Sequence, residues 1–128
     1  MDDADGHGTH VTTIAAGNFV AGGNASGMAP QAHVAVYKAC GETSCPEESL
    51  ISAIVAAVDD GVDVISLSIG GTSETTYDHE PVAVASFAAM RACVLVVATA
   101  GNDGPFPSTV HNDVPWLMTV GAGTVTDH

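Results

Sequence analysis

Short apolar runs alternate along the chain with longer segments in which apolar residues recur at helical spacing. Four short runs predict β-strands: His33–Ala39, Val62–Ser68, Val94–Thr99 and Leu117–Val120. Two longer segments predict helices: Glu47–Asp59 and Pro81–Ala92. Continuously apolar strands joined by helices indicate a parallel sheet covered by helices on both faces. The pattern therefore predicts an α/β fold with a parallel sheet, in one domain over 1–128.

The ends of the two helices carry recognisable signals. Pro46 and the acidic pair Glu47-Glu48 mark the start of the first helix, and Gly61 ends it. Pro81 can supply the first helical position of the second. The apolar stripe expected to face the core in the first helix consists of Leu50, Ile51, Ile54, Val55 and Val58.

Composition narrows the class of protein. With 46% hydrophobic and 13% charged residues, 128 residues suffice for one buried core. Two cationic residues stand against 15 acids, and the formal charge of −13 repels nucleic acids and anionic lipids alike. No apolar run reaches the roughly 20 residues of a spanning helix. From this charge and the absence of such a run we expect neither nucleic-acid nor membrane partners. The start at Met1 lacks the basic and apolar regions of a signal peptide, so nothing is expected to export this chain if Met1 is its true start.

The three cysteines fall into two groups. Cys40 and Cys45 flank four residues and are close enough to bridge across a turn, whereas Cys93 lies beside an apolar strand and is expected to pack as a small hydrophobe. The 40–45 bridge is expected if the protein is secreted and not if it is cytosolic.

Two glycine-containing segments follow neighbouring predicted strands. Ser68-Ile69-Gly70-Gly71 ends one strand and Ala100-Gly101-Asn102 ends the next. Reactive groups in a parallel sheet gather at the carboxyl ends of the strands, so the two segments are expected to lie side by side. Glycine allows close backbone approach, and an extended peptide could pair with Ser68–Gly70 as an added strand.

The sequence resembles a known family over nearly its whole length. Asp5-Gly6-His7-Gly8-Thr9-His10-Val11 resembles the catalytic-histidine motif of the subtilisin-like serine proteases, and Ala100-Gly101-Asn102-Asp103-Gly104-Pro105 resembles the segment with which that family holds its oxyanion. Further segments are similar in order and spacing to the plant-type subtilases: Gly27–Pro30, Val34–Lys38, Asp60–Gly71 and Pro115–Ala122.

The resemblance implies a role for particular residues. His7, at the start of a helix that runs to Gly17, matches the catalytic base, and Asn102 matches the oxyanion donor; both are expected to face one cleft, with His10 packed elsewhere. Two segments match the walls of the primary specificity pocket: Ser68, Ile69 and Gly70, and Thr99, Ala100 and Gly101. The implied parent is a secreted (extracellular, apoplastic) serine endopeptidase that acts on peptides or proteins without a cofactor.

Other chemistries fit the residues less well. Without the family context, a histidine among glycines would be a loop residue, and His7 with His10 lacks the glutamate and the i, i+4 spacing of a zinc protease. Gly22-Gly23-Asn24 and Gly70-Gly71 do not form a nucleotide-binding motif. The acids at 59, 60 and 63 are most simply solvated caps. Four histidines carry no motif and are expected to be structural or without a role: His33, His79, His111 and His128. We therefore expect no metal and no cofactor.

Two parts of the family's active site have no match in the 128 residues. No Asp-Thr-Gly or Asp-Ser-Gly stretch precedes His7, and nothing like Gly-Thr-Ser-Met-Ala follows Asn102. The serines at 26, 66 and 108 lack the setting of a nucleophile. We expect an internal fragment of a catalytic domain that is inactive alone and associates through exposed core surface. The alternative is a truncated or pseudo-protease product that at most binds peptides or proteins.

Overall fold

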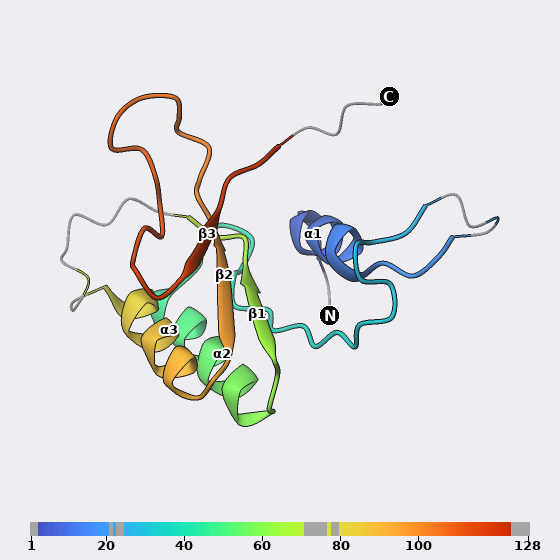
Figure 1. The fold of residues 1–128 in the computed structure, drawn as a ribbon, viewed down its shortest axis with the longest axis horizontal. Helices are drawn as coiled ribbons and strands as arrows, with labels where there is room; N and C mark the ends of the chain where they lie inside the picture. Colours follow the sequence, from blue (N-terminus) through green and yellow to red (C-terminus); the bar gives the residue numbers. More distant parts are fainter. Residues whose placement is uncertain (1–2, 21, 23–24, 71–76, 78–79, 124–128) are drawn as a thin grey trace. The chain divides into compact units, whose positions relative to one another are not determined.

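The computed structural model describes residues 3–20, 22, 25–70, 77 and 80–123. The chain divides into two compact units, Met1–Ser44 and Cys45–His128, and each is described here by itself. The first contains helix α1 (His7–Ala16). The second contains α2 (Glu47–Asp59), β1 (Val64–Leu67), α3 (Pro81–Arg91), β2 (Leu95–Thr99) and β3 (Met118–Val120) (Figure 1).

The C-terminal unit is built on a parallel sheet. The strand order is β1-β2-β3, with Val64 opposite Leu95 and Val97 opposite Met118. All three strands lie within segments that the sequence predicts as strands, and the fold class is confirmed as α/β with a parallel sheet and helices.

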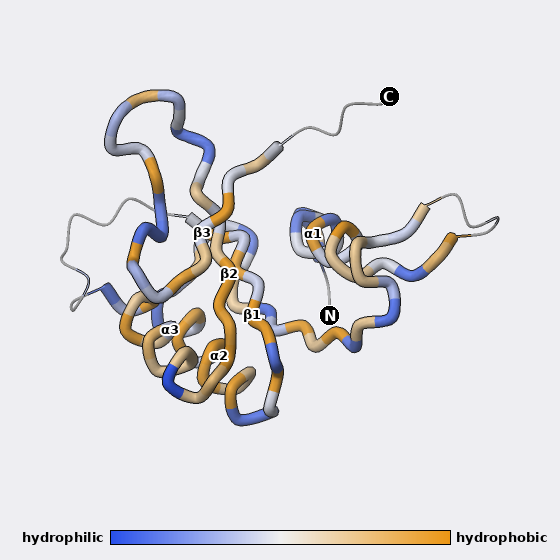
Figure 2. The backbone as a smooth tube through the Cα atoms, viewed as in Figure 1, coloured by the Kyte–Doolittle hydropathy of each residue, from blue (hydrophilic) through white to orange (hydrophobic). Residues whose placement is uncertain are grey.

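Two helices and one side of the sheet form the core of this unit. Helix α2 packs against α3, and α3 packs against β2 (Figure 1). Hydrophobic positions run along these three elements (Figure 2). The buried apolar residues are Leu50, Ile54, Ala57, Ile65, Ala83, Ala85, Ala89, Val94, Val96, Ala98 and Val114. In α2 the buried stripe includes Ala57 instead of the expected Val55, which is 48% exposed.

The opposite side of the sheet carries apolar side chains that neither α2 nor α3 buries. Paired residues of a parallel sheet share a face, and Ile65, Val96 and Ala98 lie on the buried one. On the other face, four apolar side chains are about half exposed: Val64, Leu95, Met118 and Val120. Within the described part of the C-terminal unit, α2 and α3 cover one face of the sheet only, because α2 packs against α3 and α3 packs against β2. The expectation of helices on both faces is thus met for one face of this unit.

The N-terminal unit consists of α1 and the chain that folds back along it. The backbone N–H groups of Met28 and Ala29 donate to the carbonyls of Ile14 and Ala15, both at 2.9 Å. The strand predicted over 33–39 is wrong, since no strand is present there and Val34 and Val36 are exposed. An apolar run becomes a strand only where a neighbouring strand completes its ladder, and the ladders of β1, β2 and β3 do not include it.

The cysteines divide as one pair and one free thiol. Cys40 and Cys45 are disulfide-bonded, and Cys93 is free, so the bond joins the first two. The structure thus contains the bridge that is expected if the protein is secreted. Cys93 is exposed, contrary to the expectation that it packs as a hydrophobe. No helix among the described residues has the length and apolar character needed to cross a membrane.

Candidate functional site

The turn before His7 is fixed by one glycine and one carboxylate. Gly6 has φ of 76°, a left-handed conformation that glycine adopts without strain, and α1 begins at the next residue, His7. The Asp3 carboxylate accepts hydrogen bonds from the backbone N–H groups of Gly6 (3.2 Å) and Thr9 (2.8 Å) and from the Thr9 hydroxyl. His7 is exposed on this turn, so its imidazole is accessible.

These contacts also favour the ionised form of Asp3. The hydrogen bond from the Thr9 hydroxyl, followed by the one from the Thr9 backbone N–H, lowers the pKa of Asp3 below its ordinary value of 3.8. Asp3 is therefore ionised at neutral pH and accepts from the first turn of the helix. Its partners give it a positioning role for the segment that carries His7.

Asn102 stands just beyond the carboxyl end of β2. The backbone N–H of Ala100 donates to the carbonyl of Val120 at 2.8 Å, which extends the contact between β2 and β3 by one residue. Gly101 then turns with φ of 84°, and its N–H donates to the Thr99 hydroxyl at 3.1 Å. The Asn102 side chain is exposed, and among the described residues its amide has no hydrogen-bond partner. A free amide at this edge is able to donate to a ligand.

The two segments predicted as pocket walls are joined by Asn112. Its side-chain amide donates to the carbonyl of Ile69 at 3.0 Å and to the carbonyl of Thr99 at 2.9 Å. Asn112 itself has φ of 53°, a left-handed conformation that asparagine tolerates better than most residues. The expected side-by-side arrangement of the segments after β1 and β2 is confirmed; their role in binding stays a prediction.

His111 lies against both of these segments. Its backbone N–H donates to the carbonyl of Ala100 at 3.0 Å, and its Nε2 lies 2.6 Å from Oδ2 of Asp103. Only 11% of the His111 side chain is exposed, against 57% for Asp103. Sequence reasoning missed the contacts of His111 and Asn112, because both form across 8 to 43 residues of chain and no local motif indicates them.

The segment after this loop is anchored by Trp116. Its indole N–H donates to the carbonyl of Ala83 (3.0 Å) and to the hydroxyl of the fully buried Ser86 (3.1 Å), and its ring contacts Phe87 and Tyr77 edge to face. These contacts fix the start of β3 against α3, and with it the loop that carries Asn102, His111 and Asn112.

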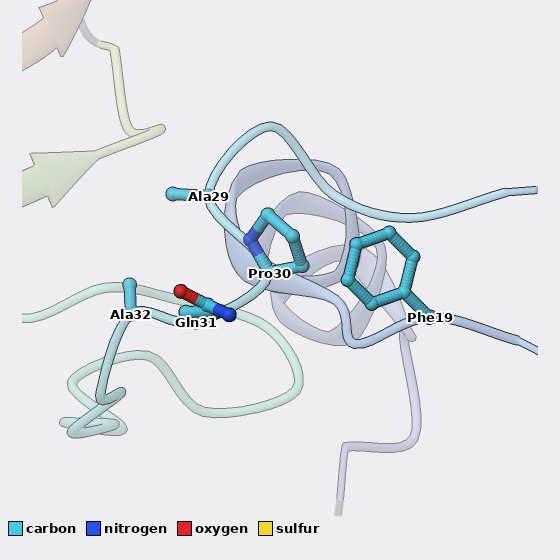
Figure 3. A pocket seen from close by; sticks show the side chains of 5 residues that line it. All are labelled: Phe19, Ala29, Pro30, Gln31 and Ala32. Carbon is cyan, nitrogen blue, oxygen red and sulfur yellow. The ribbon is translucent and has the colours of Figure 1, made fainter. Parts of the chain in front are cut away.

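The described residues show neither a cluster of metal ligands nor a pocket lined by catalytic side chains. No group of three or more histidine, cysteine, aspartate or glutamate side chains in the described ranges is arranged to hold a metal ion. A pocket in the N-terminal unit is lined by Phe19, Ala29, Pro30, Gln31 and Ala32, which supply no acid, base or nucleophile (Figure 3). The candidate site is therefore carried by the His7 turn and by the edge of the sheet around Asn102.

His7 and Asn102 belong to different units, 1–44 and 45–128. The expectation that the two side chains face one cleft thus stays a prediction. His10, one turn after His7, has its backbone N–H bonded to the carbonyl of Gly6 at 2.9 Å, and the residue is exposed instead of packed.

Comparisons with known proteins agree on one family. The model of the Subtilase family matches residues 1–127. The subtilisin-like protease SBT1.9 of Arabidopsis thaliana is 49% identical over 96% of this chain, and SBT1.5 of the same plant is 46% identical over 96%. The chain spans 19% and 17% of these two relatives, respectively.

Solved structures share the fold. The S41 psychrophilic protease aligns with a TM-score of 0.73 and 28% identity, covering 87% of this chain and 37% of that one. MycP1 without its N-terminal propeptide aligns with a TM-score of 0.69 and 24% identity, covering 93% of this chain and 46% of that one.

Proposed function

Because the chain belongs to the subtilase family of serine-type peptidases, we propose that it forms the histidine-to-asparagine section of the catalytic domain of a secreted plant endopeptidase. The observation that carries the proposal is the family match over residues 1–127. It is supported by the resemblance of the segments around His7 and Asn102 to two motifs of that family. The chain covers less than a fifth of the length of these two relatives. The catalytic aspartate and serine would be supplied by other parts of a longer enzyme.

His7 is proposed as the general base. A neutral imidazole can take the proton of a serine hydroxyl and return it to the leaving amine. Side chains that change protonation state near neutral pH are the best suited to such proton transfer. The exposed position of His7 at the first residue of α1 supports this role, since the ring is accessible and its backbone is fixed by Gly6 and Asp3.

Asn102 is proposed as the oxyanion donor. A neutral amide donates to the oxygen on which negative charge develops during acyl transfer, and it does not itself titrate. The left-handed turn at Gly101 and the exposure of the Asn102 side chain beyond the carboxyl end of β2 support this role.

The substrate is proposed to be an extended peptide that lies along Ser68–Gly70 as an added strand. Its side chain would enter between the two wall segments that Asn112 joins. Secretion is supported by the Cys40–Cys45 disulfide, which is typical of oxidising compartments, and by the plant relatives. By itself the chain is proposed to be inactive, because a catalytic triad acts as a unit.

Labelling with a fluorophosphonate probe tests this proposal. The full-length protein should be labelled at one serine outside residues 1–128, and substitution of His7 with alanine should abolish labelling. The 128-residue chain should not be labelled. The full-length sequence should include a strand that ends in an Asp-Thr-Gly or Asp-Ser-Gly motif before His7. It should also include a helix that begins with a Gly-Thr-Ser motif after Asn102. An unlabelled full-length protein would instead support the non-catalytic, peptide-binding alternative.

A further inference from the structure

The imidazole of His111 occupies the space between the two wall segments. A Cβ atom placed on Gly70 would lie 2.7 Å from Nδ1 of His111, and one on Gly101 would lie 2.9 Å from its Cγ and Cδ2 atoms. Real Cβ contacts are essentially never this short. The ring therefore fills the volume that side chains at these two glycines would take, and it touches the segments that follow β1 and β2.

The ring itself makes one hydrogen bond, and two further contacts hold the main chain around it. The backbone N–H of His111 donates to the carbonyl of Ala100, which ties the residue to the segment after β2. Its Nε2 is bonded to Oδ2 of Asp103 at 2.6 Å, a short distance typical of a charge-assisted hydrogen bond. The neighbouring Asn112 is tied to both walls through its amide. Rotation of the imidazole out of the gap would break the bond to Asp103.

We propose that His111 is a specificity-determining residue of the peptidase site: its ring limits the size of the substrate side chain that enters between Ser68–Gly70 and Thr99–Gly101. The inference rests on the proposed function of these segments as substrate walls. The substrates it favours carry a small side chain, such as alanine or serine, before the cleaved bond. A large aromatic side chain would have to displace an imidazole that is 11% exposed and hydrogen-bonded to Asp103.

The test compares two peptide substrates of the full-length enzyme that differ only in alanine or phenylalanine before the cleaved bond. We compare kcat/KM for the phenylalanine peptide with kcat/KM for the alanine peptide. In His111→Ala this ratio should rise about tenfold or more, because the substrate side chain can then occupy the volume of the missing ring. His33→Ala removes an exposed histidine that belongs to neither wall segment and should leave the ratio unchanged. A ratio in His111→Ala within about threefold of the wild type would overturn the inference.

A second variant covers a failure of His111→Ala to fold. Asp103→Ala keeps the imidazole and removes only its hydrogen bond to the carboxylate. The ratio of kcat/KM for the phenylalanine peptide to that for the alanine peptide should therefore also rise, by a smaller factor of about threefold or more. Asp59→Ala makes the same change of charge at the end of α2 and should not move the ratio. If His111→Ala does not fold, an unchanged ratio in Asp103→Ala overturns the inference. Wild-type enzyme that is not labelled by a fluorophosphonate and cleaves neither peptide refutes the proposed function itself, a result distinct from an active enzyme with an unchanged ratio.

Discussion

The side-chain amide of Asn112 donates to the carbonyl oxygen of Ile69, 43 residues earlier in the chain, at 3.0 Å. The second hydrogen of the same amide is donated to Thr99 at 2.9 Å. One side chain thus joins the ends of β1 and β2 where main-chain pairing has stopped, and the spacing of the proposed substrate walls depends on it.

Asn112→Asp removes both donor hydrogens and keeps the size of the side chain. We expect the free energy of unfolding to fall by about 2–4 kcal/mol, because two hydrogen bonds are lost and a carboxylate then faces two carbonyl oxygens. Urea unfolding followed by the fluorescence of Trp116, the only tryptophan, measures this. Asn18→Asp is the matched control, since the Asn18 side chain only accepts a bond from Phe19. A loss of under about 0.5 kcal/mol at Asn112 would show that the clamp is unimportant.

Gly70 and Gly101 should respond differently to alanine. Gly70→Ala places a Cβ against the His111 ring and should cost about 1–3 kcal/mol, most of which should vanish in the double variant with His111→Ala. Gly101→Ala should keep a cost of about 1 kcal/mol even without the ring, because Gly101 has φ of 84°. A double-mutant cycle of unfolding free energies checks both. Additive costs at Gly70 and His111 would mean that the ring can move away freely.

Asp3 should stabilise the start of α1 only when it is ionised. Since the pKa of Asp3 is lowered in the folded state, its stabilising effect is fully present above about pH 4 and is lost as the pH falls through the lowered pKa. Thr9→Val removes the hydrogen bond from the Thr9 hydroxyl, which is the largest cause of the lowered pKa, and should raise the pKa of Asp3 toward 3.8. Thr12→Val, an identical change away from Asp3, should not. Titration of the Asp3 carboxyl carbon by nuclear magnetic resonance reads this directly; equal pKa values in the wild type and Thr9→Val would contradict it.

Alkylation should distinguish the three cysteines. The protein purified without reductant is expected to take one label, at the exposed Cys93, and three labels after reduction. Cys45→Ser should lower the free energy of unfolding by about 2 kcal/mol, the chain-entropy value for so short a loop. Mass spectrometry of the labelled peptides gives the count. Three labels without reductant, in protein secreted by a eukaryotic host, would rule out the disulfide.

The sequence predicts well those elements whose partners are near in the chain. The helix Glu47–Asp59 is observed with the predicted bounds, because its acidic first turn and its apolar spacing are local properties. The strand over 33–39 fails for the opposite reason: an apolar run does not reveal whether a neighbour is present to pair with it. Val55 fits the helical stripe but stays exposed, since α2 buries the side that carries Ala57.

The candidate site divides in the same way. Gly6, His7, Gly101 and Asn102 stand in contiguous motifs that a resemblance can identify. The Asp3 carboxylate at the turn, the ring of His111 and the amide of Asn112 act through contacts that only the folded chain makes. Chain topology therefore decides which polar residues shape the walls of the site.

The most direct test of the central claim is turnover per titrated active site in the full-length enzyme with Asn102→Ala. If Asn102 donates to the oxyanion, kcat per site should fall by about 10²–10³-fold while KM changes little, a range known from subtilisin itself and not calculated from this chain. A merely structural Asn102 would reduce the yield of titratable sites and leave each remaining site nearly as fast as the wild type. A change in kcat per site of less than about threefold, well below the 1.4 kcal/mol that corresponds to a tenfold effect, would contradict the assignment.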